Sequence, residues 1–230
     1  MINTNEKISP QHPDIEWINN FDPQKRILTG NRYFIAKRLM DLFLVLVTLP
    51  LWLPLLSIVA LAVTMTSPGA PVIFKQLRTG KGGRRFHMYK FRTMVPNADE
   101  LKIKYAHLNE LQWPDFKIKD DPRITTAGKF MRKTSLDELP QLINILRGEM
   151  SLVGPRPTSF GADTYKLWQT ERLDVNPGLT GLWQIAGRGR LEFDQRLRLD
   201  IAYIERASLW LDIVILFRTV LAVLQSRGAH

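Results

Sequence analysis

The chain has 230 residues, enough to bury one good core with a small appendage at most. It carries 32 Lys and Arg against 22 Asp and Glu, and the net charge of +10 indicates an anionic partner: nucleic acid, anionic lipid or a phosphorylated small substrate. Cysteine is absent, which excludes disulfides, thiolate zinc sites and a cysteine nucleophile. A zinc cluster is not expected, because the histidines lack ligand spacing (His12, His87, His107 and His230).

A polar, Pro-rich segment without a secretory signal pattern reaches to about Asn31. The apolar run that follows, residues 42–65, has no charge and is long enough to span a hydrocarbon core. Pro50 and Pro54 lie near its middle, where each removes a helix hydrogen bond. Both flanks are basic, which by the positive-inside rule puts both ends in the cytoplasm (Lys37, Arg38, Lys75 and Arg78). A helix that breaks at the prolines and returns to the same face satisfies both observations, and a kinked spanning helix is the alternative.

A second apolar stretch, residues 208–226, lies near the other end of the chain. Asp212 and Arg218 interrupt it, so it is a poor spanning segment. We expect a helix that lies in the membrane interface or docks on the protein, and an internal core helix fits equally well.

Residues 72–94 predict two strands joined by a Gly-rich turn at residues 80–83. No acid falls between Lys75 and Arg92, and period-two alternation puts Lys90 and Arg92 on one face, where two cations could grip a diphosphate. The turn lacks the context of a phosphate loop, so a hairpin turn is the better interpretation. A lipid-facing or solvated surface is the plainer interpretation of the basic run.

Three further stretches carry candidate polar residues. Pro155 and Pro157 hold Arg156 stiffly, which suits an arginine that meets an anion in one geometry, although a structural turn would have the same pattern. Residues 176–190 are Gly-rich and present Trp183 and Arg188. An Asp-Asp-Pro sequence at residues 120–122 indicates a turn more simply than a metal site.

The adjacent acids Asp137 and Glu138 have two interpretations. With Ser135, Glu138 completes a capping box, or Asp137 caps the helix itself and leaves Pro140 in the first turn. Either arrangement puts both carboxylates at a helix N-terminus. In the functional interpretation, one carboxylate stays ionised beside Arg132 and attacks phosphorus, while its neighbour holds a Mg²⁺ ion that screens the phosphate oxygens.

Five segments taken together resemble the bacterial sugar transferases, also called monotopic phosphoglycosyl transferases: "KRLMD", "YKFRTM", "RKTSLDELPQLINILRGEMSLVGPRP", "NPGLTGLWQIAGR" and "LDIAYIERASLWLDIVILFRT". The match runs in order from about Arg32 to the C-terminus. It is most similar to the short exopolysaccharide-priming members that transfer galactose or glucose phosphate, without the N-terminal bundle of spanning helices found in longer members.

The resemblance implies a reaction in which UDP-sugar and polyprenyl phosphate give polyprenyl-diphospho-sugar and UMP, at the cytoplasmic face of a bacterial inner membrane. By position, Asp137 is the nucleophile that forms a covalent phospho-sugar intermediate, and Glu138 is the Mg²⁺-associated partner. Lys90 and Arg132 match residues near the phosphates, and Arg156 matches the arginine that meets the nucleotide. No nucleic acid partner is implied, and a homodimer is left open.

The implied fold is α+β: a compact membrane-associated domain with an N-terminal re-entrant helix–break–helix hairpin and C-terminal interfacial helices. Residues 1–31 would form a polar extension, residues 32–66 the re-entrant membrane helix, and residues 67–230 the catalytic domain. Many members have Ser-Pro at the break, whereas here Leu53 precedes Pro54, so the serine's backbone-bonding role does not transfer.

Two other classes of protein fit parts of the sequence. Aromatic residues near basic ones would suit a membrane-tethered nucleic-acid-binding protein (Tyr89, Phe91 and Trp183). A non-catalytic scaffold of a polysaccharide export system would use the acids only as caps. The nucleic-acid-binding alternative does not account for an apolar hairpin or for paired acids within a basic region. The sequence does not indicate which sugar is transferred.

Overall fold

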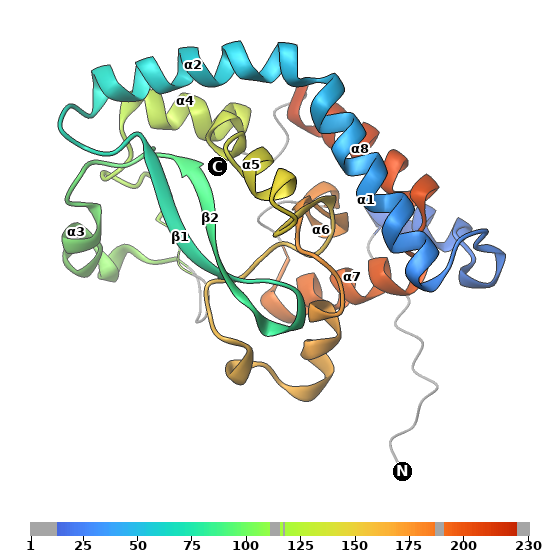
Figure 1. The fold of residues 1–230 in the computed structure, drawn as a ribbon. Coiled ribbons are helices and arrows are strands. Elements are labelled where there is room, and N and C mark those ends of the chain that lie inside the picture. The colour runs from blue at the N-terminus through green and yellow to red at the C-terminus, as the bar shows by residue number, and fades with distance from the viewer. Residues whose placement is uncertain (1–12, 111–115, 117, 187–190, 225–230) are drawn as a thin grey trace.

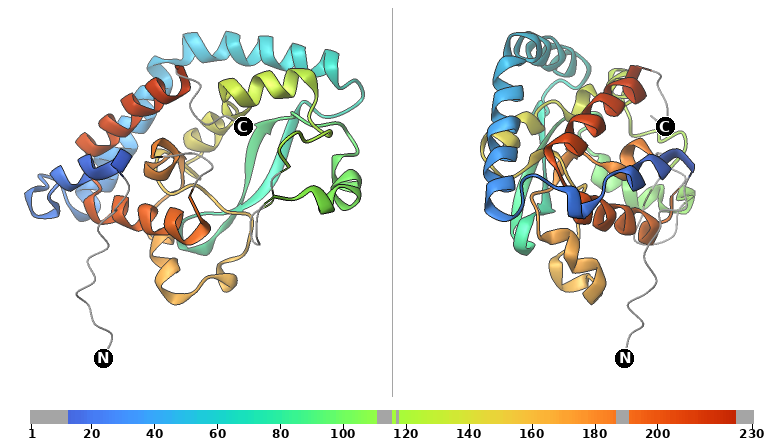
Figure 2. Two further views of the ribbon diagram at one scale, coloured as in Figure 1. Left: turned by 180° about the vertical axis from the view of Figure 1, so that it is seen from behind. Right: turned by 90° about the vertical axis from the view of Figure 1, so that its right-hand side faces the viewer.

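The computed structural model describes residues 13–110, 116, 118–186 and 191–224 (Figures 1 and 2). It confirms a mixed helix-and-strand fold. The helices are α1 (Gly30–Val47), α2 (Leu49–Thr66), α3 (Ala98–Lys104), α4 (Thr126–Thr134), α5 (Gln141–Leu146), α6 (Leu182–Ile185), α7 (Phe193–Arg206) and α8 (Leu209–Leu224). The strands are β1 (Ile73–Thr79), β2 (Arg85–Phe91), β3 (Ser151–Val153) and β4 (Gly178–Thr180). Of the described residues, α2 alone is long and apolar enough to cross a membrane by length and composition.

The apolar run is interrupted at Thr48, between α1 and α2, and the two helices meet at a sharp bend (Figure 1). Pro50 lies in the first turn of α2, where a missing N–H costs little, so it sits directly after the break as predicted. The prediction of a break at Pro54 is wrong, because this residue lies inside α2 and the helix continues through it.

Two side chains satisfy the backbone carbonyls at the bend. The Thr48 hydroxyl donates to the Leu44 carbonyl at 2.6 Å, and the indole N–H of Trp52 donates to the Val45 carbonyl at 2.9 Å. Unpaired carbonyls would be costly in an apolar environment. Thr48 and Trp52 thus add side-chain hydrogen bonds to carbonyls near the end of α1.

Helix α1 is amphipathic in the reverse of the usual sense, with charged side chains toward the protein and large apolar side chains toward the outside. It buries Lys37 and Asp41 and exposes large apolar side chains (Ile35, Leu39, Phe43, Leu46 and Val47). Helix α2 likewise exposes Leu51, Ile58, Leu61 and Met65. Exposed apolar surface this extensive marks a membrane or partner interface.

The buried polar side chains of α1 bind other elements. Lys37 pairs with Asp212 of α8 at 2.8 Å, and Asp41 accepts a 2.6 Å hydrogen bond from Ser151 of β3. The Tyr203 hydroxyl of α7 donates to the other oxygen of Asp212 at 2.6 Å. Asp212 is fully buried. The acid that makes the C-terminal stretch a poor spanning segment therefore links α8 to α1 through its ion pair with Lys37.

The predicted hairpin is confirmed: β1 and β2 pair antiparallel, with Phe74 opposite Lys90. The amide of Asn144 on α5 binds the open edge of β2, accepting from the Tyr89 N–H at 3.0 Å and donating to the His87 carbonyl at 2.7 Å. Asn144 is completely buried. It therefore fixes the strand that carries Lys90 against the helix that follows the acidic pair.

A second sheet of two parallel strands, β3 and β4, lies behind the site. The backbones approach so closely that a Cβ on Gly178 would lie 2.1 Å from the Gly154 nitrogen. Glycine at these two positions permits the approach. The close packing places the Pro155–Pro157 segment, which follows β3, beside the start of β4.

Part of the polar N-terminal segment packs on the main core. Ile15 and Ile18, in the 3-10 helix Pro13–Asn20, are fully buried, and the Arg218 guanidinium of α8 lies 4.2 Å from the Trp17 ring centre. Helices α1 and α8 run side by side in both views (Figure 2). The N-terminal segment thus covers one end of this helix pair.

Candidate active site

The acidic pair lies in a 3-10 turn, Leu136–Glu138, between α4 and α5. Ser135 adopts a left-handed backbone (φ 58°) that ends α4, and α5 begins only at Gln141. Neither turn nor helix has a side-chain cap, so both capping interpretations are wrong. The physical reason is that Ser135 turns the chain out of α4 instead of starting a new α-helix, which leaves the two carboxylates free of the helix ends.

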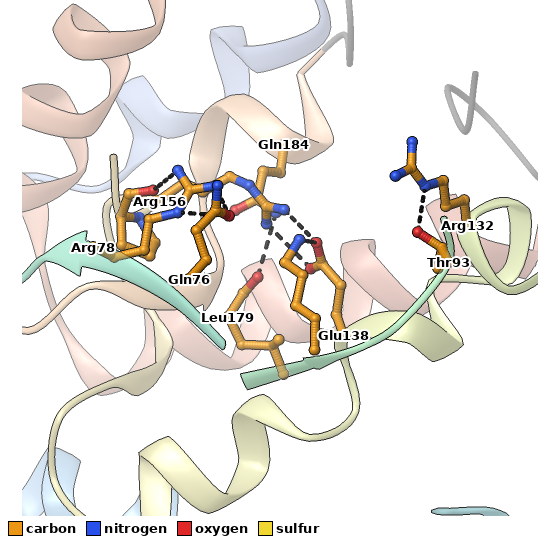
Figure 3. Close-up of polar contacts among 10 residues, drawn as sticks. Gln76, Arg78, Thr93, Arg132, Glu138, Arg156, Leu179 and Gln184 are labelled. Carbon is orange, nitrogen blue, oxygen red and sulfur yellow. Dashed lines mark hydrogen bonds and ion pairs between the residues drawn. The ribbon is translucent and has the colours of Figure 1, made fainter. Parts of the chain in front are cut away.

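Glu138 is held between two cations. Its carboxylate accepts a hydrogen bond of 2.8 Å from the Lys90 ammonium and one of 3.1 Å from Arg156 Nη1. A second, shorter contact comes from Arg156 Nη2 (Figure 3). Burial by itself would raise the pKa of Glu138, but the ion pairs with Arg156 and Lys90 outweigh it and hold the pKa well below its usual range. Glu138 is therefore ionised under all ordinary conditions.

Asp137 has a different environment although it is adjacent in sequence. Its side chain is buried, with 8% of the residue exposed, and no described residue forms a hydrogen bond or ion pair with its carboxylate. Burial raises the pKa of Asp137, against the lowering influence of Lys90, Arg132 and Arg156. A desolvated carboxylate without hydrogen-bond donors is a stronger nucleophile than a solvated one.

Arg132 lies to one side of the Glu138 group (Figure 3). Its Nε donates to the Thr93 hydroxyl at 3.0 Å, which leaves the terminal guanidinium nitrogens available. The approach of α4 to Thr93 depends on Gly128, because a Cβ there would lie 2.1 Å from the Thr93 carbonyl oxygen. Arg132 stabilises the charged form of Asp137 from this position.

Arg78 on β1 is a site residue that the sequence placed only within a general basic run. Its guanidinium donates to the Pro157 carbonyl at 3.1 Å and to the Gln76 side chain (Figure 3). Burial and the nearby charge of Arg156 lower its pKa to about 10. Two guanidinium groups thus share one small region, which favours occupation by an anion between or beside them.

The backbone of Arg156 is held by a buried ion pair that no local sequence pattern predicts. Arg172 donates to the Arg156 carbonyl and to Asp200 on α7, the latter at 2.7 Å. Both partners are buried, at 4% and 1% exposure. A turn alone does not explain Arg156, since its side chain meets Glu138 while its carbonyl is fixed by Arg172.

Two predicted placements are not as expected. Arg92 does not join Lys90 in gripping an anion, because its Nε donates to the Pro71 carbonyl at 2.8 Å beyond the end of β2. The strand ends at Phe91, so the alternation does not extend to Arg92. Trp183 is covered by the Arg196 guanidinium 5.4 Å from its ring centre, and Arg188 lies outside the described residues.

Asp121, in the Asp-Asp-Pro segment, pairs with Arg123 at 2.6 Å, in agreement with the turn interpretation.

A resident Mg²⁺ ion would need several oxygen ligands, and proteins usually supply one or two carboxylates beside substrate phosphates. No cluster of three acid, histidine or cysteine side chains occurs in the part of the chain described. Both oxygens of Glu138 already accept from Lys90 or Arg156. These residues do not fit a Mg²⁺ ion held by Glu138 in the protein alone.

The charges in this region are unbalanced. Lys90, Arg132, Arg156 and Arg78 surround Asp137 and Glu138, and the Glu138 carboxylate is occupied by two of these cations. The excess positive charge suits a diphosphate-sized anion next to Asp137. The site can therefore bring an anionic phosphorus centre to an unpaired carboxylate.

Comparison with known proteins assigns the chain to a family. The model of the bacterial sugar transferase family matches residues 32–226, and the chain belongs to that family. The chain is 47% identical over 171 residues to the undecaprenyl-phosphate galactose phosphotransferase of Salmonella typhimurium, covering 72% of this chain and 36% of the relative. It is 42% identical over 210 residues to the UDP-glucose:undecaprenyl-phosphate glucose-1-phosphate transferase of Xanthomonas campestris pv. campestris, covering 87% and 41%.

A third relative has a similar length. The exopolysaccharide production protein ExoY of Rhizobium meliloti is 40% identical over 203 residues, covering 85% of this chain and 88% of the relative. By contrast, the chain spans less than half the length of the Salmonella and Xanthomonas relatives.

Proposed function

We propose that this protein transfers a sugar 1-phosphate from a UDP-sugar, UDP-galactose or UDP-glucose, to polyprenyl phosphate and releases UMP. The observation that carries the proposal is the buried carboxylate of Asp137, which binds none of the described residues, beside a Glu138 that pairs with Lys90 and Arg156. The activities for which the Salmonella and Xanthomonas relatives are named support the reaction class. The resulting lipid-linked sugar would begin exopolysaccharide synthesis.

In the proposed first step, an oxygen of Asp137 attacks the phosphorus that carries the sugar. The bond to the bridging diphosphate oxygen breaks, and UMP leaves with that oxygen. Lys90, Arg132 and Arg156 stabilise the charge on the phosphoryl oxygens, a contribution that acts without reorganisation in a buried site. The product is a sugar phosphate esterified to Asp137.

In the second step, an oxygen of polyprenyl phosphate attacks the same phosphorus. The bond to Asp137 breaks, the carboxylate is restored, and polyprenyl-diphospho-sugar is released. No net proton is gained or lost, so the site needs no general base of the histidine type. Glu138 keeps its two cations in place in both steps.

We further propose that Mg²⁺ is required and that it enters with the diphosphate, since the described residues offer no cluster of acids or histidines that would hold it alone. Phosphate-bound Mg²⁺ is common in phosphoryl-transfer sites, where it neutralises charge on the transferred group. No role of the residues described above depends on its position.

The proposed setting is the cytoplasmic face of the bacterial inner membrane. Residues 32–66 would form a re-entrant hairpin and residues 67–230 the catalytic part, with α8 in the interface. The inverted burial of α1 supports this arrangement, because its apolar face needs a nonpolar surrounding while its charged side chains are satisfied inside the protein. A homodimer stays a prediction.

The test is to incubate membranes containing the protein with polyprenyl phosphate, Mg²⁺ and a panel of UDP-sugars, and to measure UMP. Release of UMP with UDP-galactose or UDP-glucose, lost in Asp137→Asn, is the expected result. Equal release by wild type and variant would refute the role of Asp137, and no release with any UDP-sugar would favour a scaffold.

A further inference from the structure

An apolar cavity of about 450 Å³ lies directly behind the acidic pair. Its walls come from α1, β3, β4 and α8, and include Leu44, Leu152, Leu179 and Leu216. Its polar end is formed by Ser135 and Glu138. Figure 3 shows Leu179, one of the wall residues, beside the pair formed by Glu138 and Arg156.

The pocket is open at the surface and is not an interior void, since Phe217 and Val220 in its lining are exposed. Its volume falls in the range of ligand pockets, about 300–1,000 Å³. Most of the lining side chains are apolar, and two of the polar ones bind each other, since the hydroxyls of Thr180 and Thr219 are 2.8 Å apart. The walls therefore offer dispersion contacts and little hydrogen bonding, which suits a hydrocarbon occupant.

The cavity connects the reacting groups with the apolar outer surface. Phe217 and Val220 of α8 line it, yet 65% and 57% of these residues are exposed. They lie on the same helix as Trp210 and Leu224, which are also exposed. A chain that enters past Phe217 and Val220 would have its far end at Glu138, next to Asp137.

We propose that this cavity holds the first isoprene units of the acceptor lipid, with the lipid phosphate at the Glu138 end. The inference rests on the proposed function, and it names where the second substrate binds. A lipid phosphate must reach the phosphorus on Asp137, and its chain must leave that point through apolar surroundings. The cations that hold Glu138 provide the phosphate's counter-charge at the same end.

The first experiment fills the cavity. Val220→Trp and Leu216→Trp place an indole in the space, and Leu221→Trp is the matched control, since it adds the same group to α8 at a position that does not line the cavity. Two rates are measured in detergent: the UMP burst from UDP-sugar without lipid, and steady-state turnover against polyprenyl phosphate. The burst is the internal reference for each variant.

We expect the KM for polyprenyl phosphate to rise about tenfold or more in both cavity variants, relative to the burst, and to change little in Leu221→Trp. An unchanged KM in Val220→Trp and Leu216→Trp would overturn the cavity assignment. A wild-type protein that releases no UMP from any UDP-sugar, even with polyprenyl phosphate present, would refute the proposed function instead, so the two failures are distinct.

The second experiment does not depend on the folding of the tryptophan variants. A photo-reactive phenylalanine analogue replaces Phe217 or, as the control, Phe130, which is exposed on α4 and does not line the cavity. We expect crosslinking to a radiolabelled polyprenyl phosphate at position 217 only, with competition by unlabelled polyprenyl phosphate and not by phosphatidic acid. Equal competition by phosphatidic acid would show an ordinary phospholipid site and would contradict the proposal, as would equal crosslinking at position 130.

Discussion

Asp137 and Glu138 are adjacent in one 3-10 turn, yet their carboxylates have opposite environments. Glu138 accepts bonds from Lys90 and Arg156, whereas no described residue binds the carboxylate of Asp137. The pKa of Glu138 is lowered and that of Asp137 is raised. Neighbouring acids whose environments separate their pKa values often divide their roles, and here the division is between an anchor for cations and a nucleophile.

The first prediction is that Asp137→Asn gains stability as it loses activity. Because burial raises the pKa of Asp137 in the folded state, its ionised form costs folding free energy at pH values above the unfolded pKa. A neutral amide removes that cost, so the free energy of unfolding at pH 7 should rise by about 0.5–2 kcal/mol. Denaturant titration in detergent measures it, with Asp163→Asn at an exposed position as the control. A clear loss of stability would show that Asp137 has a structural partner.

The second prediction concerns Glu138→Gln. Removing this charge leaves Lys90 and Arg156 close together without their counter-ion, and breaking such a pair costs about 3–5 kcal/mol when it is fully buried. Since Glu138 is 17% exposed, we expect a loss of about 3 kcal/mol. Glu205→Gln, which breaks an exposed pair with Arg206, should cost less than about 1 kcal/mol.

The same variant separates two roles of Glu138. If its main partners are the two cations, raising the Mg²⁺ concentration will not restore UMP release to Glu138→Gln. Restoration by millimolar Mg²⁺ would mean that Glu138 acts chiefly as a metal ligand and that its ion pairs open during turnover.

The third prediction concerns membrane topology. The chain has no cysteine, so Lys25→Cys and Glu100→Cys, both at exposed positions on either side of helices α1 and α2, each provide a single reporter thiol. In sealed inverted vesicles both should react with a membrane-impermeant maleimide, because a re-entrant hairpin leaves both ends on the cytoplasmic side. A thiol that reacts only in right-side-out vesicles would establish a spanning helix.

The fourth prediction is a pH dependence that originates at Asp200. Burial, opposed by the ion pair with Arg172, raises the pKa of Asp200 to about 6. The folded state therefore holds a proton that the unfolded state has lost between about pH 4 and 6, and stability should fall as pH rises through this window. Asp200→Asn should flatten that dependence, whereas Asp194→Asn, at an exposed position on α7, should retain it. A slope unchanged in Asp200→Asn would contradict the assignment.

Asp200→Asn also tests how Arg156 is positioned. Arg172 binds both Asp200 and the Arg156 carbonyl, so weakening its ion pair loosens the segment that carries Arg156. We expect a higher KM for the UDP-sugar with a smaller change in kcat. An effect on kcat alone would show that Asp200 does not influence the binding of the UDP-sugar.

The sequence predicted the parts of the site that have local signatures. The hairpin follows from alternation and its Gly-rich turn, and Lys90, Asp137, Glu138 and Arg156 were candidates from charge and backbone stiffness. The spacing of these residues in the sequence did not predict that they contact one another, since Lys90 and Glu138 are 48 residues apart in the chain. It depends on Asn144, whose amide binds the edge of β2.

Other features depend on tertiary contacts that have no one-dimensional pattern. A buried Lys37 or Asp212 looks like an interruption of an apolar helix until both are seen to pair. The break was predicted at the prolines and falls at Thr48, where the side chains of Thr48 and Trp52 bind carbonyls of α1, contacts that no proline rule specifies. Arg172 and Asp200 likewise meet only in the folded chain.

The measurement that tests the central claim most directly is mass spectrometry of enzyme quenched in acid after mixing with UDP-sugar in the absence of lipid. The account predicts a hexose-phosphate adduct on the peptide containing Asp137, which disappears when polyprenyl phosphate is added before the quench. Product formation with no adduct on that peptide at any quench time would contradict it.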